Sequence, residues 1–265
     1  MTPCSFGING GEFPHWPVAE ICDLAVKVRA QFVELSSRRL AGEGIPAVRK
    51  ELDARSLRIH VNAGASDLAA GFGVARALDA PVIVLFDDAI ERVDGSRRQS
   101  LDEFRATVRG LIDQPGHEGI RLAIENSFIK ITRQPEDLLA IVRRIDHPRV
   151  GVNFDADNFY NAGIEPFPYA YELLKGHIVQ LHAKDSMRYL PAVHGEDRRV
   201  LHRAGGNVIC VPLGTGAVNW QGLVARLKRD GYRGAVSLEP HTMPEEMAAV
   251  MEQDAAYLRA AGLVA

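Results

Sequence analysis

Apolar residues along the chain first stand out as short continuous runs. Runs rich in β-branched residues are typical of parallel strands that are covered on both faces. The run VIVLF, which Pro81 opens, is the clearest of them. Eight runs predict eight strands: Cys4–Asn9, Phe32–Leu35, Leu57–Asn62, Val82–Phe86, Arg121–Glu125, Val150–Asp155, Ile178–His182 and Ala235–Glu239.

Between these runs, apolar residues recur with the period of an amphipathic helix. After Pro17, apolar residues at i, i+3, i+4 and i+7 lie on one helix face: Val18, Ile21, Cys22 and Ala25. Similar patterns predict eight helices in all. They are one after Pro17, Ile45–Arg55, one from Ser66-Asp67 to near Ala80, Ser96–Gln114, Pro135–Ile145, Phe167–Lys175, Trp220–Asp230 and one from Thr242 to Ala261.

Capping residues predict where three of these helices begin. Ser66-Asp67 and Asn219 each precede a helical pattern and can cap it. Thr242 with Glu245 three residues later forms the pattern of a capping box, which predicts that the last helix starts there.

The regular alternation of strands and helices predicts the fold. Alternation of this kind favours parallel strands joined by right-handed crossovers. Eight units in 265 residues fit a closed α/β barrel, the (β/α)8 TIM barrel, as one domain over residues 1–265. The stretch Ser186–Pro212 breaks the rhythm and is predicted to be a long polar loop, since it is poorly periodic.

Composition narrows the classes of partner. The net charge of −3 argues against a nucleic-acid-binding surface. No apolar run approaches the ~20 residues of a membrane span, and the first residues do not resemble a signal peptide. The three cysteines are far apart and odd in number, which favours reduced, buried thiols. We therefore expect a cytoplasmic protein with no membrane or nucleic-acid partner.

Side chains that commonly bind metals end four consecutive predicted strands: Glu125, Asp155, His182 and Glu239. In a barrel, such strand ends meet at one mouth. Three carboxylates there repel each other, and a divalent cation removes that repulsion. An oxygen-rich set with one imidazole suits Mn²⁺, Mg²⁺ or Co²⁺, with Zn²⁺ as a further option. The alternative is that each residue is only a polar residue at a strand end. This alternative is weaker for the set, because four strand ends would each have to carry a ligand-type residue by chance.

Other polar residues near the predicted mouth are candidates for substrate binding. His60 lies on the third strand and points either into the mouth or into the core. Lys184 and Asp185 follow the seventh strand, and either bind substrate or pair with neighbouring groups. Glu34, near the end of the second strand, and His241, just beyond the eighth, are further candidates.

Several motifs together resemble the xylose isomerase-like TIM-barrel superfamily. That superfamily includes sugar and sugar phosphate isomerases and epimerases, inosose-processing enzymes and endonuclease-IV-type (AP endonuclease family 2) proteins. The matching segments are spread over nearly the whole chain: FVELS, LAIENS, VGVNFDADNFYNAG, IVQLHAKDS, VPLGTGAVNW and GYRGAVSLEP. The His-x-Lys-Asp step and the Gly-x-Gly-x-Val-Asn-Trp segment are the most specific of these.

The resemblance implies roles for individual residues. It implies that the four strand-end residues are the metal ligands and that Glu125 and Glu239 act as the acid/base pair. An Arg six residues after the metal His binds substrate in the ketose 3-epimerases, and Arg188 stands at that offset. Members often have His three residues after the Asp ligand. Asn158 stands there and can hydrogen-bond a sugar hydroxyl, but it is a poorer metal ligand and no base.

We therefore predict a metal-dependent isomerase or epimerase of a ketose or related polyol ketone, acting through a metal-stabilised enediolate. A dehydratase of an inosose- or dehydroshikimate-like ketone is the main alternative, since it begins with the same proton abstraction. A non-catalytic sugar-binding barrel and an AP endonuclease-like hydrolase are weaker alternatives. The three-zinc endonuclease site needs further His residues, but this chain has no His in its fourth strand, Asn158 where members often have His, and no Asp-x-His pair. The sequence leaves open whether the substrate is phosphorylated and whether the protein is a homo-oligomer.

Overall fold

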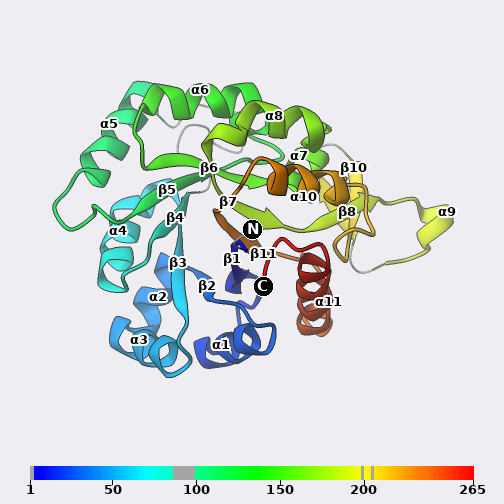
Figure 1. The fold of residues 1–265 in the computed structure, drawn as a ribbon, viewed down its shortest axis with the longest axis horizontal. Coiled ribbons are helices and arrows are strands. Elements are labelled where there is room, and N and C mark those ends of the chain that lie inside the picture. Colours follow the sequence, from blue (N-terminus) through cyan, green and yellow to red (C-terminus); the bar gives the residue numbers. More distant parts are fainter. Residues whose placement is uncertain (1–2, 86–98, 198–199, 204–205) are drawn as a thin grey trace.

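Eight parallel strands close into a barrel in the computed structural model, which describes residues 3–85, 99–197, 200–203 and 206–265 (Figure 1). Around the barrel the strands follow the order β1-β11-β7-β6-β5-β4-β3-β2, and β1 pairs with both β11 and β2. This confirms the predicted (β/α)8 TIM barrel. The barrel strands are β1 Ser5–Asn9, β2 Phe32–Ser36, β3 Arg58–Ala63, β4 Val82–Leu85, β5 Arg121–Glu125, β6 Val150–Asp155, β7 Ile178–Ala183 and β11 Ala235–Leu238.

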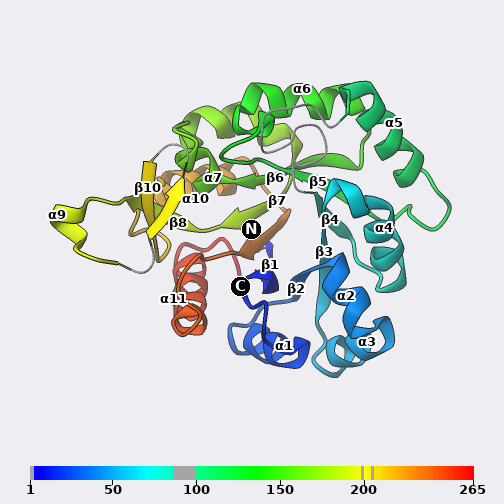
Figure 2. The same ribbon diagram turned by 180° about the vertical axis from the view of Figure 1, so that it is seen from behind.

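Helices surround the barrel on its outside, as the two opposite views show (Figures 1 and 2). They are α1 Val18–Lys27, α2 Ser37–Glu43, α3 Ile45–Ala54, α4 Leu68–Ala77, α5 Leu101–Ile112, α6 Pro135–Ile145, α7 Ala156–Asn161, α8 Tyr171–Leu174, α10 Trp220–Arg229 and α11 Met247–Ala260, whereas the short α9 Pro191–His194 lies away from the barrel (Figures 1 and 2). The predicted apolar face after Pro17 is buried in α1. Among the described residues, no helix is both long and apolar enough to cross a membrane.

Helix starts agree only partly with the capping prediction. Asn219 caps α10 as predicted, because its side chain accepts the backbone N–H of Gly222. The last helix begins at Met247, not at Thr242, whose hydroxyl instead bonds the side chain of Glu246. Asp67 immediately precedes α4 but its carboxylate accepts the N–H of Gly64 and caps no α4 group.

Two predicted helices differ in extent, and two short helices were not predicted. The helix predicted over Ser96–Gln114 is α5, which begins only after a capping box of Ser100 with Glu103; residues 96–98 lie outside the described part. The predicted Phe167–Lys175 helix is reduced to α8, behind a π-helical turn over Pro166–Ala170. The short helices α2 and α7 were missing from the prediction because each starts directly on the last polar residue of a strand.

The prediction of a long loop over Ser186–Pro212 is wrong. Residues 185–211 form an antiparallel sheet of β8 Asp185–Arg188, β10 Gly206–Val211 and β9 Val200–Arg203, with α9 in between. We call residues 185–211 the arm, because it extends away from the barrel in both views (Figures 1 and 2). Its strands β8 and β10 are only partly buried, so the sequence shows no continuous apolar run of the kind that marks the barrel strands.

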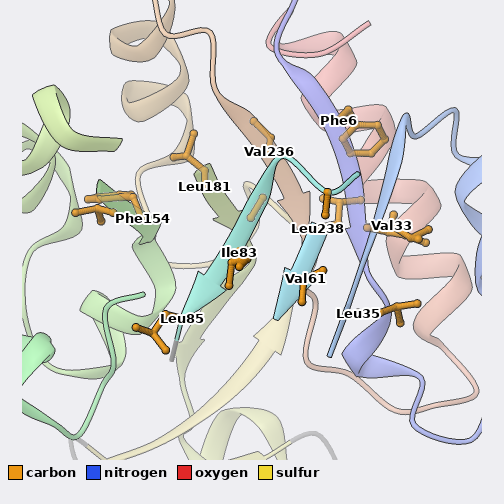
Figure 3. Close-up of a cluster of buried hydrophobic side chains, with 14 of the residues drawn as sticks. Phe6, Val33, Leu35, Val61, Ile83, Leu85, Phe154, Leu181, Val236 and Leu238 are labelled. Atoms are coloured by element: carbon orange, nitrogen blue, oxygen red, sulfur yellow. The ribbon is translucent and has the colours of Figure 1, made fainter. Parts of the chain in front are cut away.

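Side chains alternate across each barrel strand and divide the fold into two cores. One set packs outward against the helices and includes Val33, Leu35, Val61, Phe154 and Leu181 (Figure 3). The other set faces the barrel axis. Near the start of the strands it forms a small separate apolar cluster of Val82, Val84, Ala123 and Val179.

Towards the ends of the strands, the inward side chains are polar. On β2 and β3 these are Glu34, His60 and Asn62, which alternate with outward apolar residues and are nearly inaccessible to solvent. A register shift between β6 and β7 brings Gln180 opposite Asn153 and His182 opposite Asp155. Buried polar groups need hydrogen-bond partners. At this level of the barrel, the interior is therefore filled by polar side chains instead of apolar ones.

Candidate functional site

Four residues at the ends of neighbouring strands bring their ligand-type atoms together. One such atom from each of Glu125, Asp155, His182 and Glu239 lies within 4.8 Å of the others, and all four residues are buried. Glu125, Asp155 and His182 stand at or near the ends of β5, β6 and β7, and Glu239 directly follows β11. The structure therefore gathers the four residues that the sequence singled out, in an arrangement that can hold a metal ion. We call them the cluster.

Each carboxylate of the cluster has one oxygen bonded to an amide. Asp155 Oδ1 accepts the backbone N–H of Asn158 at 2.9 Å. Glu239 Oε1 accepts Asn9 Nδ2 at 2.7 Å, and Glu125 Oε1 accepts Asn158 Nδ2 at 3.3 Å. The second oxygens differ, since Glu125 Oε2 and Asp155 Oδ2 are buried without any hydrogen bond. Buried carboxylate oxygens that accept no hydrogen bond are suited to bind a cation.

Lys184 supplies the positive charge nearest to these carboxylates. Its Nζ lies 2.8 Å from Asp155 Oδ2 and 2.7 Å from Glu239 Oε2. Among the described residues, Lys184 is the only positive group that contacts Asp155 Oδ2. Burial alone would lower the pKa of Lys184, but the surrounding carboxylates raise it well above the usual range, so the side chain is an ammonium.

The carboxylates of the cluster differ in their electrostatic surroundings. Burial, together with the charges of Glu239 and Asp155, raises the pKa of Glu125 to about 7. Burial acts on Glu239 in the same direction, but His182 and Lys184 outweigh it and hold the pKa of that carboxyl well below its usual range. Two carboxyl groups in one small site thus differ in their affinity for a proton, with that of Glu125 the higher.

A buried hydrogen-bonded chain fixes the ring of His182. Its Nδ1 faces the cluster, 3.2 Å from both Glu125 Oε1 and Glu239 Oε2. Its Nε2 lies 2.8 Å from Glu34 Oε1 on the opposite side of the ring. Glu34 Oε2 in turn accepts Gln180 Nε2 at 2.6 Å. Burial lowers the pKa of His182, but the surrounding carboxylates outweigh burial and raise it well above its usual range, so the ring is an imidazolium. With Glu34 behind Nε2, Nδ1 is the nitrogen that would release its proton to bind a metal ion.

His60 lies at the far end of this chain. Its Nδ1 is 2.7 Å from Gln180 Oε1, and its ring stacks on Phe32 with 3.8 Å between the centroids. Burial lowers the pKa of His60 to about 4, which keeps the ring neutral. The structure resolves the choice left open by the sequence in favour of the core, so it does not bring His60 to the substrate side as predicted.

A cavity of about 390 Å³ opens above the cluster. A volume of this size suits a small organic molecule. Its walls include Glu125 and Glu239 of the cluster, whereas Asp155 and His182 do not line it. The full lining is Asn9, Gly11, Glu12, Ser36, Asn62, Glu125, Asn126, Ser127, Phe128, Asn158, Lys184, Glu239 and His241. A larger cavity of about 770 Å³ lies between α10 and α11, but no residue of the cluster lines it, so we assign the site to the smaller one.

Asn158 lines this cavity, whereas the other two predicted substrate residues lie elsewhere. Asp185 is buried at the base of the arm, where it accepts the backbone N–H groups of Gly214, Gly216 and Val218. Burial raises its pKa to about 7, against the opposing effect of those N–H groups. Arg188 is exposed on β8, opposite Val208 of β10. Neither residue is brought to the cavity wall.

Gly216 explains part of the Gly-x-Gly segment that the sequence singled out. A Cβ at Gly216 would lie 2.2 Å from Asp185 Oδ1, so only glycine allows the carboxylate to reach this loop. The segment therefore closes the base of the arm.

Sequence reasoning overlooked several residues of the site. Asn9 donates to Glu239 and Asn126 donates to the Asp155 carbonyl, yet neither asparagine was predicted as a site residue. Glu12 faces His241 at 3.6 Å, and with Glu239 these two form a second group of metal-ligand type. The signal that could have found Asn9 and Asn126 is the position itself, since each ends or directly follows a barrel strand.

Comparisons with known proteins agree with this architecture. The family model described as xylose isomerase-like TIM barrel matches residues 22–261. Among curated proteins, the uncharacterized protein MJ1311 of Methanocaldococcus jannaschii is 26% identical over 170 residues, or 61% of this chain and 51% of that protein. The chain thus spans about half the length of that curated relative.

Solved structures also match almost the full length of the chain. D-allulose 3-epimerase from Methylomonas sp. has a TM-score of 0.75 at 15% identity, over 98% of this chain and 99% of that one. The probable 3-DHS dehydratase AsbF of Bacillus anthracis has a TM-score of 0.72 at 17% identity, over 98% and 99%. A xylose isomerase-like protein of Mycobacterium smegmatis in complex with magnesium has a TM-score of 0.73 at 18% identity, over 99% and 97%. At these identities the likeness shows the fold.

Proposed function

The chain belongs to the xylose isomerase-like TIM barrel family, and on that basis we propose that it is a divalent-metal-dependent isomerase or epimerase of a ketose or related polyol ketone. The observation that carries the proposal is the cluster at the base of a small polar cavity. Three buried carboxylates lie beside one imidazole, and two of their oxygens, Glu125 Oε2 and Asp155 Oδ2, accept no hydrogen bond. We see no way in which this arrangement stabilises the barrel.

The proposed metal ligands are Glu125, Asp155, His182 and Glu239. Their donor atoms are oxygen and one imidazole nitrogen, a set that suits Mn²⁺, Mg²⁺ or Co²⁺ and also permits Zn²⁺. The matched structure in complex with magnesium is consistent with such an ion. When bound, the ion supplies a Lewis acid that polarises a substrate carbonyl and acidifies the neighbouring C–H.

The protein's own groups would move the proton. We propose that Glu125 and Glu239 form the acid/base pair, in which either one removes a proton and the other returns it, or one residue moves it between carbons. Both line the cavity, so both can reach a bound ketone. Asn158, with its amide held by Glu125 and the Asn126 carbonyl, would orient a substrate hydroxyl.

A dehydratase of an inosose- or dehydroshikimate-like ketone remains the second candidate. It requires a general acid above the departing hydroxyl, and we consider His60 and Lys184 for this role. His60 is buried away from the cavity, whereas Lys184 lines it. The position of Lys184 is the observation that favours this candidate.

Solvent deuterium uptake tests the proposed chemistry. Metal-stripped protein reloaded with Mn²⁺ is incubated in D₂O with ketoses, inososes and dehydroshikimate and, after the Mn²⁺ is chelated, followed by NMR. We expect deuterium next to the carbonyl of one substrate only when metal is present, because proton abstraction there is common to all candidate reactions. The product then separates isomerase, epimerase and dehydratase. A protein that binds no metal and exchanges no substrate proton would refute the proposal.

Glu34→Gln tests how the cluster is held. The change replaces the carboxylate behind His182 Nε2 and places an NH₂ group against Gln180 Nε2, so the chain of hydrogen bonds must rearrange. We expect Mn²⁺ affinity, measured by calorimetry, to fall about 10–100-fold. Glu51→Gln, in the surface ion pair with Arg55, is the matched control and should leave affinity unchanged. Equal affinity of Glu34→Gln and wild type would exclude this role.

A further inference from the structure

Lys184 occupies the oxygens that a metal ion would need. In each carboxylate of the cluster, one oxygen is engaged by an amide and the other is left for a cation. Two of these remaining oxygens, Asp155 Oδ2 and Glu239 Oε2, are contacted by Lys184 Nζ at 2.8 and 2.7 Å. The third, Glu125 Oε2, has no hydrogen-bond partner. The ammonium therefore lies where the negative charge of the cluster converges.

We propose that Lys184 is the internal counter-ion of the metal-free site and that a divalent cation displaces its ammonium from Asp155 and Glu239. This inference rests on the proposed function, since it assumes that the cluster binds the metal. A metal–oxygen distance is about 2.0–2.2 Å, so a metal on Asp155 Oδ2 and Glu239 Oε2 would lie close to an ammonium that contacts the same two oxygens. The repulsion between the two cations favours withdrawal of the ammonium.

Burial explains why a counter-ion is needed at all. Side chains of Asp155 and Glu239 are 0% and 8% exposed, and a buried carboxylate without a partner costs several kcal/mol. Glu239 also faces His182 at 3.2 Å, but Lys184 is the only positive group that contacts Asp155 Oδ2 among the described residues. Lys184 thus balances the charge of Asp155 when no metal is bound, and its flexible four-carbon stem lets it withdraw.

The displaced ammonium has one evident destination. Lys184 lines the cavity above the cluster and is the sole Lys or Arg among the described residues of its wall. In the metal-loaded protein, its three N–H donors would then face the bound substrate instead of the carboxylates. Metal binding would thus both complete the cluster and release a cation that favours a substrate with an oxyanion or carboxylate.

Metal affinity in the absence of substrate tests the exchange. Lys184→Met keeps the stem and removes the competing charge, so we expect Mn²⁺ to bind on the order of ten- to a hundredfold more tightly by calorimetry. The metal-dependent rise in Tm should also be larger in the variant, because its metal-free form is less stable. Lys27→Met, which breaks a surface ion pair with Glu252, is the control and should change neither quantity.

A second measurement does not depend on the stability of the variant. In wild-type protein with ¹³Cε-labelled lysine, one resonance, assigned with Lys184→Arg, should shift as diamagnetic Mg²⁺ or Zn²⁺ fills the site. Weaker or equal metal binding by Lys184→Met, or an unmoved resonance at saturation, would overturn the inference while leaving the proposed metal function intact. Wild-type protein that binds no divalent metal would overturn both.

Discussion

Glu239→Gln is expected to lower turnover by at least about 10³-fold while the fold is retained. Glutamine has nearly the same shape and can still accept Asn9 Nδ2, so the packing around the site changes little. It cannot take up a proton, and it no longer supplies the negative charge that faces His182 and Lys184. Loss of a general acid/base alone costs about 10²–10⁴-fold, and weaker metal binding adds to it.

The rate of substrate deuterium exchange at saturating Mn²⁺ measures this effect, with circular dichroism as the check on folding. Glu252→Gln, an exposed glutamate of α11, is the matched control and should exchange at the wild-type rate. Wild-type activity of Glu239→Gln would remove Glu239 from the mechanism.

Asp185→Ala is expected to have a comparably large effect, on stability instead of chemistry. The carboxylate accepts three backbone N–H groups of the loop that returns from the arm, and the Val218 bond is fully buried. Each buried donor left without a partner costs about 1–3 kcal/mol. We expect a loss of about 3–5 kcal/mol in the free energy of unfolding, or a fall in Tm of about 10 °C for a chain of this size.

Thermal unfolding measures this loss, and Asp53→Ala on the exposed side of α3 is its control. Below the melting transition, the KM of Asp185→Ala should equal that of wild type. A variant with normal Tm and a raised KM would instead support the substrate contact that the sequence suggested for Asp185.

The barrel could be predicted because strand patterns and helix patterns occupy separate segments of the chain. Strands such as Val82–Leu85 are continuous apolar runs, and helices such as α1 carry one clear apolar face. The cluster could be predicted because parallel strands of a barrel deliver their last residues to one mouth, so order along the chain becomes proximity in space. Neither step requires knowledge of side-chain contacts.

The roles of the remaining site residues depend on how deep each side chain lies in the barrel and where it points, and the sequence pattern reports neither. His60 and Glu34 are on inward-facing positions like Glu125, but they lie lower in the barrel and support His182 from below. Whether Lys184 faces the carboxylates or a helix depends on how β7 ends. The arm was misjudged because its pairing joins segments as distant as Asp185 and Val211, and no local period reports such pairing.

The base of the arm has a consequence for how this barrel could diversify. The chain leaves β7 at Asp185, and the returning loop is fastened to the same residue and to the Ser186 carbonyl, which accepts the N–H of Ala217. Exit and return are thus joined independently of what lies between them, and extra loop length costs little once the ends are fixed. We therefore expect the outer part of the arm around α9 to tolerate exchange. Recombination or design could lengthen, shorten or replace it to reshape the outer surface while the cluster keeps its geometry.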